Sequence, residues 1–259
     1  DNEVMFYASY SRGYKAGGFA LGQVGGYDPE KVDALESGLK SRWLDNRLQM
    51  NFAAFYYDYQ DKQDFQRFFN PAAGSTVFQI LNAASATSSG FELEIQAQLT
   101  DSFFFDFSLG YLNAEFDDFI SDDTVAPIGG GLQDLSGNKV PFSPEWSSHL
   151  GVQYDWDMRG FGVLSARGDY SWTDEQFSNA FNRDASNGLA GDGDFLPSYK
   201  IINARLQWTS ADMTWSADLY VNNLTDEVIL SNPFVATANR THGTYLPPRT
   251  YGLKVAYSF

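Results

Sequence analysis

The sequence predicts an all-β protein, an antiparallel up-and-down β-barrel segment whose strands cross a membrane. Three observations lead to this fold class. Apolar and polar residues alternate with a period of two along most of the chain, short and long connections alternate, and aromatic residues make up 17% of the 259 residues. A strand points successive side chains to opposite faces, so the alternation predicts a sheet with one apolar and one polar face.

Ten strands are expected, and seven of them alternate clearly. In the clearest, Phe91, Leu93 and Ile95 alternate with Glu92 and Glu94. The seven lie at residues 90–99, 103–111, 150–156, 164–172, 202–208, 215–221 and 251–259. Three earlier strands fit the pattern less cleanly, at about 4–13, 33–44 and 47–66. No segment gives a convincing helical pattern.

The connections between these strands sort by length. Short polar turns are expected at 44–46, 100–102, 157–160 and 210–212. Long linkers, interpreted as extracellular loops, lie near 14–32, 67–77, 119–143, 177–197 and 226–246. Outer-membrane barrels have short turns at one end and long loops at the other, whereas a soluble sandwich with crossover connections does not sort its loops so regularly.

Aromatic residues near the strand ends support a membrane barrel, because such residues form interfacial girdles. The tryptophans in question are Trp43, Trp156, Trp172, Trp208 and Trp215. The alternative is a soluble all-β protein whose apolar faces pack a core, since alternation alone does not distinguish lipid from core.

Charge and composition exclude several functions. With 17 basic and 33 acidic residues the net charge is −16, which repels nucleic acid. The absence of cysteine from these residues excludes disulfides, thiolate metal sites and thiol catalysis within them. No cofactor is expected.

Catalytic and metal-binding motifs are missing as well. His149 begins a strand and is expected at the interface or in the lumen, and His242 lies in the last long linker as a ligand contact or a solvated residue. Acidic residues cluster in two linkers without the spacing of a calcium loop, so no metal site is predicted and solvated loops are expected. They are Glu115, Asp117, Asp118, Asp122 and Asp123 in one, and Asp184, Asp192 and Asp194 in the other.

Ligand binding is expected where strands pass into the long linkers. Rigid aromatic rings with a few cationic donors suit capture of a scarce, flat or anionic small molecule. The candidate ligand-binding residues are Tyr14, Tyr59, Phe68, Phe69, Phe177, Phe181, Arg183, Phe234, Arg240 and His242. Packing within an outer girdle and between loops is the alternative role for them.

Five segments in order resemble the C-terminal half of a TonB-dependent outer-membrane transporter. They are Tyr10–Phe19, Leu81–Ala84 followed by Ser89–Glu94, Pro141–Trp146, Asn222–Asp226, and Pro247–Gly252 before the terminal Phe259. Each piece is short, but together they extend over the whole chain.

The resemblance implies a 22-stranded barrel of the Gram-negative outer membrane, closed by an N-terminal plug. Residues 1–259 would then be the C-terminal part of the barrel, with the plug absent. It further implies TonB-coupled import of a siderophore-type iron chelate, cobalamin or an oligosaccharide. The expected partners are this small-molecule nutrient, outer-membrane lipid and lipopolysaccharide, and the TonB complex through the missing N-terminal part.

The terminal strand also resembles the assembly signal of such barrels, which the outer-membrane assembly machinery would recognise by strand addition. Its residues are Tyr251, Leu253, Val255, Tyr257 and Phe259. Two rival functions remain for a complete small barrel: a rim hydrolase or protease that uses His242 with Asp226 or Glu227, and a passive porin. An enzyme is not expected.

Overall fold

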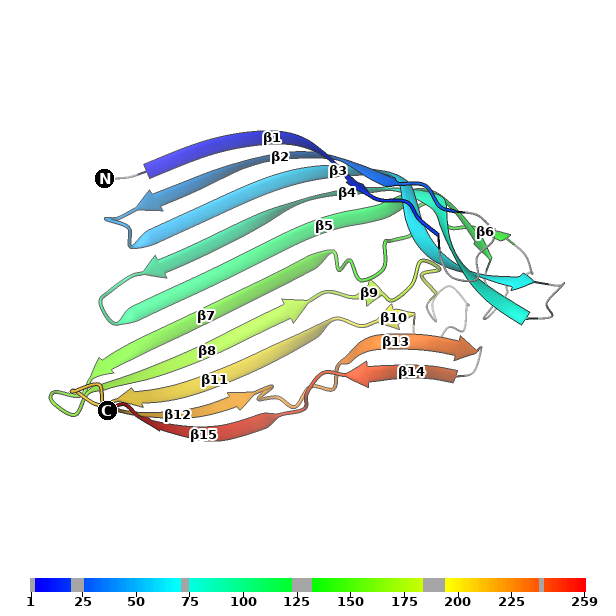
Figure 1. Cartoon of the computed structure of the whole chain (residues 1–259). Helices are drawn as coiled ribbons and strands as arrows, with labels where there is room; N and C mark the ends of the chain where they lie inside the picture. Colours follow the sequence, from blue (N-terminus) through cyan, green and yellow to red (C-terminus); the bar gives the residue numbers. More distant parts are fainter. Residues whose placement is uncertain (1–2, 20–25, 71–74, 123–131, 184–193, 238–239) are drawn as a thin grey trace.

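The computed structural model describes residues 3–19, 26–70, 75–122, 132–183, 194–237 and 240–259 (Figure 1). Ten long strands form one antiparallel meander, in which each pairs with the next along the chain. They are β1 (Glu3–Lys15), β2 (Glu30–Trp43), β3 (Leu48–Asn70), β4 (Ser75–Gln98), β5 (Phe103–Asp122), β7 (Trp146–Asp157), β8 (Val163–Thr173), β11 (Tyr199–Thr209), β12 (Trp215–Asn222) and β15 (Thr250–Tyr257). In the described part of the chain, no helix could cross a membrane.

Five further strands lie in the connections. They are β6 (Leu132–Asp134), β9 (Gln176–Phe177), β10 (Phe195–Leu196), β13 (Leu230–Thr237) and β14 (Arg240–Tyr245). The pair β9–β10 and the hairpin β13–β14 are separate from the main sheet, whereas β6 pairs with the end of β5. The main sheet curves into an open trough with β1 and β15 as its edges, and both chain ends lie at the short-turn end (Figure 1).

Strand register separates the two faces of this sheet. Phe6, Leu39, Phe52, Leu93 and Leu109 are successive register partners across β1 to β5 and form one apolar row. The neighbouring residue on each strand faces the other way, as strand geometry requires. The opposite face carries most of the charged side chains, so the sheet has an apolar face and a polar face over its whole width.

The polar face is the concave one. Tyr59 on β3 belongs to the polar face, because it lines a cavity together with Glu36 and Tyr57. Its ring packs in a cluster that Phe181, in the connection after β8, also joins. Three strands separate β3 from β8 in the sheet, so only the inside of the curve lets these two residues meet. We therefore call the polar face inner and the apolar face outer.

The ten predicted strands and the four short turns are confirmed, and all four turns lie at one end (Figure 1). The prediction of a long linker at 67–77 is wrong, because β3 and β4 continue as a paired hairpin to Asn70 and Ser75. Of the other four long linkers, those near 119–143, 177–197 and 226–246 contain the five further strands, and the one at 14–32 contains an isolated bridge between Gly18 and Tyr27. These strands are paired through backbone hydrogen bonds but do not separate an apolar from a polar surface. Their residues therefore do not alternate between apolar and polar, which is why the sequence pattern does not predict them.

The segments that carry the family resemblance are where connections attach to the sheet. The Asn82 side chain accepts a hydrogen bond from the Asp28 amide at 2.7 Å and donates to the carbonyls of Asp28 and Asp61. Asn223 uses its side chain in the same way on Glu227, and the Arg249 amide donates to Asp226 at 2.9 Å. These amide and carboxylate groups fix the bases of the first and last connections.

Candidate functional site

An apolar cluster lies on the inner face at the loop end of the sheet. Its buried members come from β4, β5 and the β5–β7 connection, and four half-buried residues pack against them. The buried members are Ala84, Ala86, Phe116, Phe119 and Leu135, and the others are Tyr59, Val140, Ala180 and Phe181. We call these nine residues the rim cluster. It joins two of the long connections to the wall of the trough.

Hydrogen bonds hold the same two connections together. Backbone amides of Gly137 and Val140 donate to carbonyls of β5 at 2.7 and 3.0 Å. The Asn138 side chain donates to the Ala180 carbonyl at 2.9 Å, and the Lys139 amide donates to the Asn182 side chain at 2.6 Å. The β5–β7 connection therefore pairs alongside β5, and together with the β8–β11 connection it forms one layer at the rim.

A buried ion pair belongs to this layer. Arg183 is 3% exposed and Asp194 is fully buried at 0%, and the Arg183 Nε donates to the Asp194 carboxylate. The side-chain amide of Asn179 donates to the same carboxylate, and the Arg183 guanidinium lies 5.2 Å from the centre of the Phe181 ring. The expectation of a solvated acidic loop is therefore wrong for Asp194. Arg183 faces a carboxylate rather than an open surface.

A second carboxylate lies at the loop end of the sheet. Asp134 in β6 accepts hydrogen bonds from the Ser136 hydroxyl at 2.6 Å and the Ser136 amide at 3.0 Å. These donors favour the ionised form and hold the pKa of the Asp134 carboxyl below its ordinary value. The loop end therefore carries a carboxylate that stays charged under mildly acidic conditions.

The other candidate ligand residues are more dispersed. The Phe177 ring packs edge to face on Phe195, with 5.8 Å between the ring centroids. Tyr14 is 79% exposed and alternates with the inner-face residues of β1, so it points outward, away from the rim cluster. The structure thus brings Tyr59, Phe181 and Arg183 together and leaves Tyr14 apart.

Five further candidates can be placed only by their backbone. Phe68 and Phe69 pair with Val77 and Thr76 near the tip of the β3–β4 hairpin. Phe234 pairs with His242, and Arg240 with Thr237, in the β13–β14 hairpin. The side chains of Phe68, Phe69, Phe234, Arg240 and His242 lie outside the described part of the structure.

The rim cluster also contains residues that the ligand prediction missed. Phe116 and Phe119 are three apart on β5, a spacing that interrupts the alternation, and Leu135 precedes a turn at Gly137 with φ of 81°. A break in period two between two phenylalanines, followed by a glycine turn, is a signal that a loop folds back onto the strand.

Below the rim, the inner wall carries a charged network across β5, β7 and β8. Arg167 Nη2 lies 2.9 Å from Asp106 Oδ1 and 2.7 Å from Asp169 Oδ1. His149 Nε2 lies 3.1 Å from Asp106 Oδ2, and its Nδ1 lies 3.0 Å from the Ser171 hydroxyl. The prediction of an interfacial or lumen position for His149 is confirmed, because it faces the inside of the trough.

A serine, a histidine and an aspartate in contact invite comparison with a hydrolase triad, but the surroundings do not support one. Strand β8, which carries Ser171, pairs with β7 on one side and β11 on the other, so its backbone amides take part in the ladder. An oxyanion hole needs free donors beside the nucleophile. Asp106 is also shared with Arg167. The arrangement is a structural bridge between three strands.

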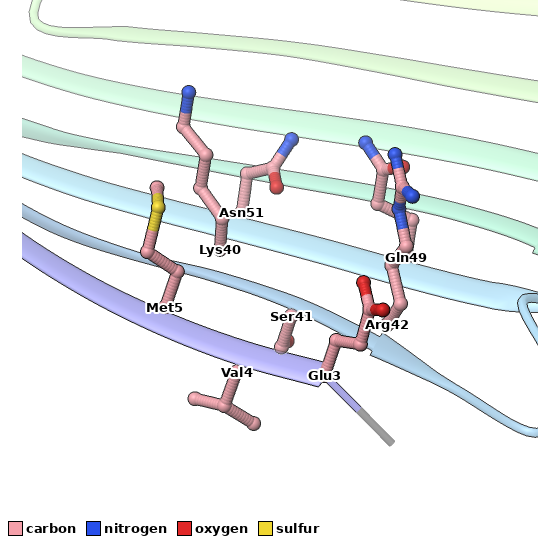
Figure 2. A pocket seen from close by; sticks show the side chains of 8 residues that line it. All are labelled: Glu3, Val4, Met5, Lys40, Ser41, Arg42, Gln49 and Asn51. Carbon is pink, nitrogen blue, oxygen red and sulfur yellow. The ribbon is translucent and has the colours of Figure 1, made fainter. Parts of the chain in front are cut away.

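A cavity of about 470 Å³ lies at the opposite, short-turn end of the wall (Figure 2). Residues of β1, β2 and β3 line it. They are Glu3, Val4, Met5, Lys40, Ser41, Arg42, Gln49 and Asn51. The Lys40 ammonium also lies 5.8 Å from the centre of the Tyr7 ring. Lys40, Arg42, Gln49 and Asn51 provide hydrogen-bond donors at this site, beside the carboxylate of Glu3.

Comparison with known proteins agrees with this architecture. A family model described as TonB dependent receptor-like, beta-barrel matches residues 1–224. Among solved structures, the ferric yersiniabactin uptake receptor FyuA of Yersinia pestis has a TM-score of 0.77 at 19% identity, covering 99% of this chain and 35% of its own. The siderophore receptor PiuA of Acinetobacter baumannii has a TM-score of 0.74 at 20% identity, covering 98% and 34%.

A third solved structure, the copper transporter OprC, has a TM-score of 0.70 at 19% identity and covers 100% of this chain and 37% of its own. The chain therefore spans about a third of the length of the structures it matches. At these identities the matches show the fold. The family and the solved relatives are receptors and transporters rather than enzymes, as expected from the missing catalytic motifs.

Proposed function

Because this chain belongs to the TonB-dependent receptor family, we propose that it forms part of the barrel wall of an outer-membrane receptor. The receptor would import a scarce nutrient across the outer membrane of a Gram-negative bacterium, with energy delivered through TonB to a plug formed by the rest of the protein. Residues 1–259 would supply the C-terminal strands of a larger barrel.

One observation carries this proposal: the same ten strands present a continuous apolar face outward and a charged face inward. Contact with lipid requires the apolar outer face, and a water-filled lumen requires the charged inner face. The apolar row from Phe6 to Leu109 crosses the first five strands, and the network of Asp106, His149 and Arg167 lies on the opposite side. A soluble sandwich would bury its apolar face instead.

The loop end is the proposed ligand-binding end, and its long connections would be extracellular. The rim cluster and the pair of Arg183 and Asp194 would hold two connections in a defined position. Phe177 and the β13–β14 hairpin, with Arg240 and His242, would then contribute ligand contacts. We propose a siderophore-type metal chelate as the ligand, since aromatic rings and cationic donors suit a flat or anionic chelate.

Uptake by the intact receptor tests the proposal. In the native bacterium grown under iron limitation, deletion of the gene should abolish uptake of one labelled ferric chelate from a panel, and deletion of TonB should have the same effect. Purified intact receptor in planar bilayers should show no steady conductance. Uptake that persists without TonB, together with high conductance, would instead indicate a passive porin.

A matched pair of variants locates the binding end. Phe177→Ala should weaken binding of that chelate by about tenfold, because an aromatic contact contributes on the order of 1 kcal/mol beyond its buried area. Phe161→Ala removes the same side chain at the short-turn end and should leave the Kd unchanged. Equal effects of the two substitutions would contradict a loop-end site.

A further inference from the structure

Two neighbouring turns at the short-turn end present apolar side chains beyond the ends of their strands. In the turn between β7 and β8, Phe161 is 75% exposed and Met158 is also exposed. In the turn between β11 and β12, Met213 is 77% exposed. We call Met158, Phe161 and Met213 the turn patch. The side chains of Phe161 and Met213 are therefore largely uncovered within the described structure.

The two turns are held together in one surface. Trp208 on β11 donates from its indole nitrogen to the Phe161 carbonyl at 2.9 Å. Gly162 has a φ of 108°, and a Cβ on it would lie 1.8 Å from the Thr209 carbonyl, so only glycine lets the first turn lie directly on the end of β11. Both turns lie side by side near the C-terminus (Figure 1).

The turn patch continues the apolar outer face rather than the inner wall. Trp208 and Trp156 are outer residues of the strands that enter these turns, in register with Leu164 between them. On the adjacent strands, Trp215 packs on Tyr257 with 4.7 Å between ring centroids. Tryptophan and tyrosine concentrate where a membrane protein meets the headgroup layer. The patch therefore lies just beyond a row of interfacial aromatic residues.

The other two turns at this end have a different character. The turn between β2 and β3 exposes Leu44 but continues with Asp45, Asn46 and Arg47, and the Arg47 guanidinium lies 3.0 Å from Asp101 in the turn between β4 and β5. Polar and paired charged groups at these tips favour water. The β4–β5 turn also exposes a leucine, Leu99, so these two turns are not free of apolar side chains. Among the four turns, exposed phenylalanine and methionine side chains lie in those of the β7–β12 part of the sheet.

We propose that the turn patch inserts into the headgroup layer of the inner leaflet and docks the β7–β12 part of the barrel on a phospholipid surface. This inference rests on the proposed function, since it requires the outer face to meet lipid. Continuity with the aromatic row favours lipid over a protein partner. Asp157, Arg159 and Asp212 at the same tips would stay among the polar headgroups while the apolar side chains reach below them.

Site-specific fluorescence tests this docking surface. These 259 residues contain no cysteine, so single cysteines can be labelled in the intact receptor after any cysteine elsewhere in it is replaced by serine. Phe161→Cys and Met213→Cys would carry an environment-sensitive dye in phosphatidylethanolamine and phosphatidylglycerol vesicles. Lipids with a nitroxide at a shallow acyl position should remove most of their emission, and aqueous iodide should have little effect.

Two controls separate this inference from the proposed function. Asn46→Cys, at the polar turn, should be quenched by iodide and not by the nitroxide lipid. Leu219→Cys, in the middle of the outer face, should be quenched by a deep nitroxide. If Leu219→Cys is not quenched, the membrane barrel itself is wrong. If it is quenched but Phe161→Cys and Met213→Cys behave like Asn46→Cys, only the docking surface is wrong.

A protein partner would give a third result. The two dyes would then remain open to iodide in vesicles of purified receptor and become shielded only in native outer membranes. That outcome would overturn the lipid assignment and leave the membrane barrel intact.

Discussion

On the inner wall, the absence of a side chain at Gly151 makes room for the ion pair between Arg167 and Asp106. Arg167 on β8 reaches across β7 to Asp106 on β5, over the position of Gly151. A Cβ at Gly151 would lie 2.3 Å from Arg167 Nη2 and 2.4 Å from Asp106 Oδ2. Because both atoms belong to an ion pair that is held on two sides, neither can move away without losing a partner.

Gly151→Ala should therefore destabilise the barrel by about 1–3 kcal/mol, the usual cost of overpacking. The midpoint of urea unfolding, measured by tryptophan fluorescence of the intact receptor in lipid vesicles, would show the change. Gly168→Ala is the control, because no atom lies within 4 Å of a Cβ at that position. Its effect should be below about 0.5 kcal/mol. Equal midpoints for the two variants would contradict this role of Gly151.

The buried pair in the rim layer gives a second prediction at the residue scale. Arg183→Met leaves Asp194 buried without its cation, which costs about 3–5 kcal/mol in comparable pairs. Hydrogen exchange of the Ser178 amide, which donates to the Asp194 carbonyl at 2.7 Å, should accelerate accordingly. Adding Asp194→Leu should slow that exchange again. If the Ser178 amide exchanges as fast in the double variant as in Arg183→Met alone, the unpaired charge of Asp194 is not the cause of the faster exchange.

At the scale of elements, the turns are defined by their own polar side chains. In the turn between β11 and β12, Asp212 accepts hydrogen bonds from the Ser210 hydroxyl at 2.6 Å and from the Thr214 amide and hydroxyl at 3.1 and 2.8 Å. These donors favour the ionised carboxyl, and the Ser210 hydroxyl is the main cause that holds the pKa of Asp212 below its ordinary value.

The sign of the pH dependence follows from that shift. A carboxyl with a lowered folded-state pKa stabilises the turn fully above its unfolded-state pKa of about 4, and the contribution is lost as pH falls through the lower folded-state value. Exchange of the Thr214 amide should therefore rise, relative to its intrinsic rate, as pH falls below about 4. In Asp212→Asn this dependence should disappear; its persistence would assign the effect to another group.

At the scale of the whole molecule, the two faces of one sheet meet different solvents. Leu109 lies in the apolar outer row, and its chain neighbour Ser108 lines an inner cavity with Glu94, Asp106 and His149. A cationic side chain at position 109 would face lipid, whereas one at position 108 would face carboxylates. Two successive residues of one strand thus meet two different environments.

Leu109→Lys should cost about 2–4 kcal/mol of folding free energy in a bilayer, as a lipid-facing cation does near the midplane. Ser108→Lys should be tolerated, since the ammonium would lie beside Glu94 and Asp106. Refolding yield into vesicles and the urea midpoint measure both variants. A reversed order of stability would mean that the assignment of inner and outer faces is wrong.

Much of the architecture could be predicted from residue pattern, because strand alternation is local. The segment with Phe91, Leu93 and Ile95 needs no tertiary information to show its two faces. The rim could not be predicted in the same way. Tyr59, Phe119, Leu135 and Phe181 meet only after two connections fold back over the trough, and their separation along the chain leaves no periodic signal.

Residue pattern alone predicts the ten strands, the four short turns and the family, because strand alternation, turn residues and the family motifs are each recognised in short segments. The three-dimensional fold sets which candidate residues meet. It buries Arg183 against Asp194, turns Tyr14 outward, and sets Gly151 beneath an ion pair. The reason is that curvature and register bring distant strands and loops together, and neither is encoded in the alternation of a single segment.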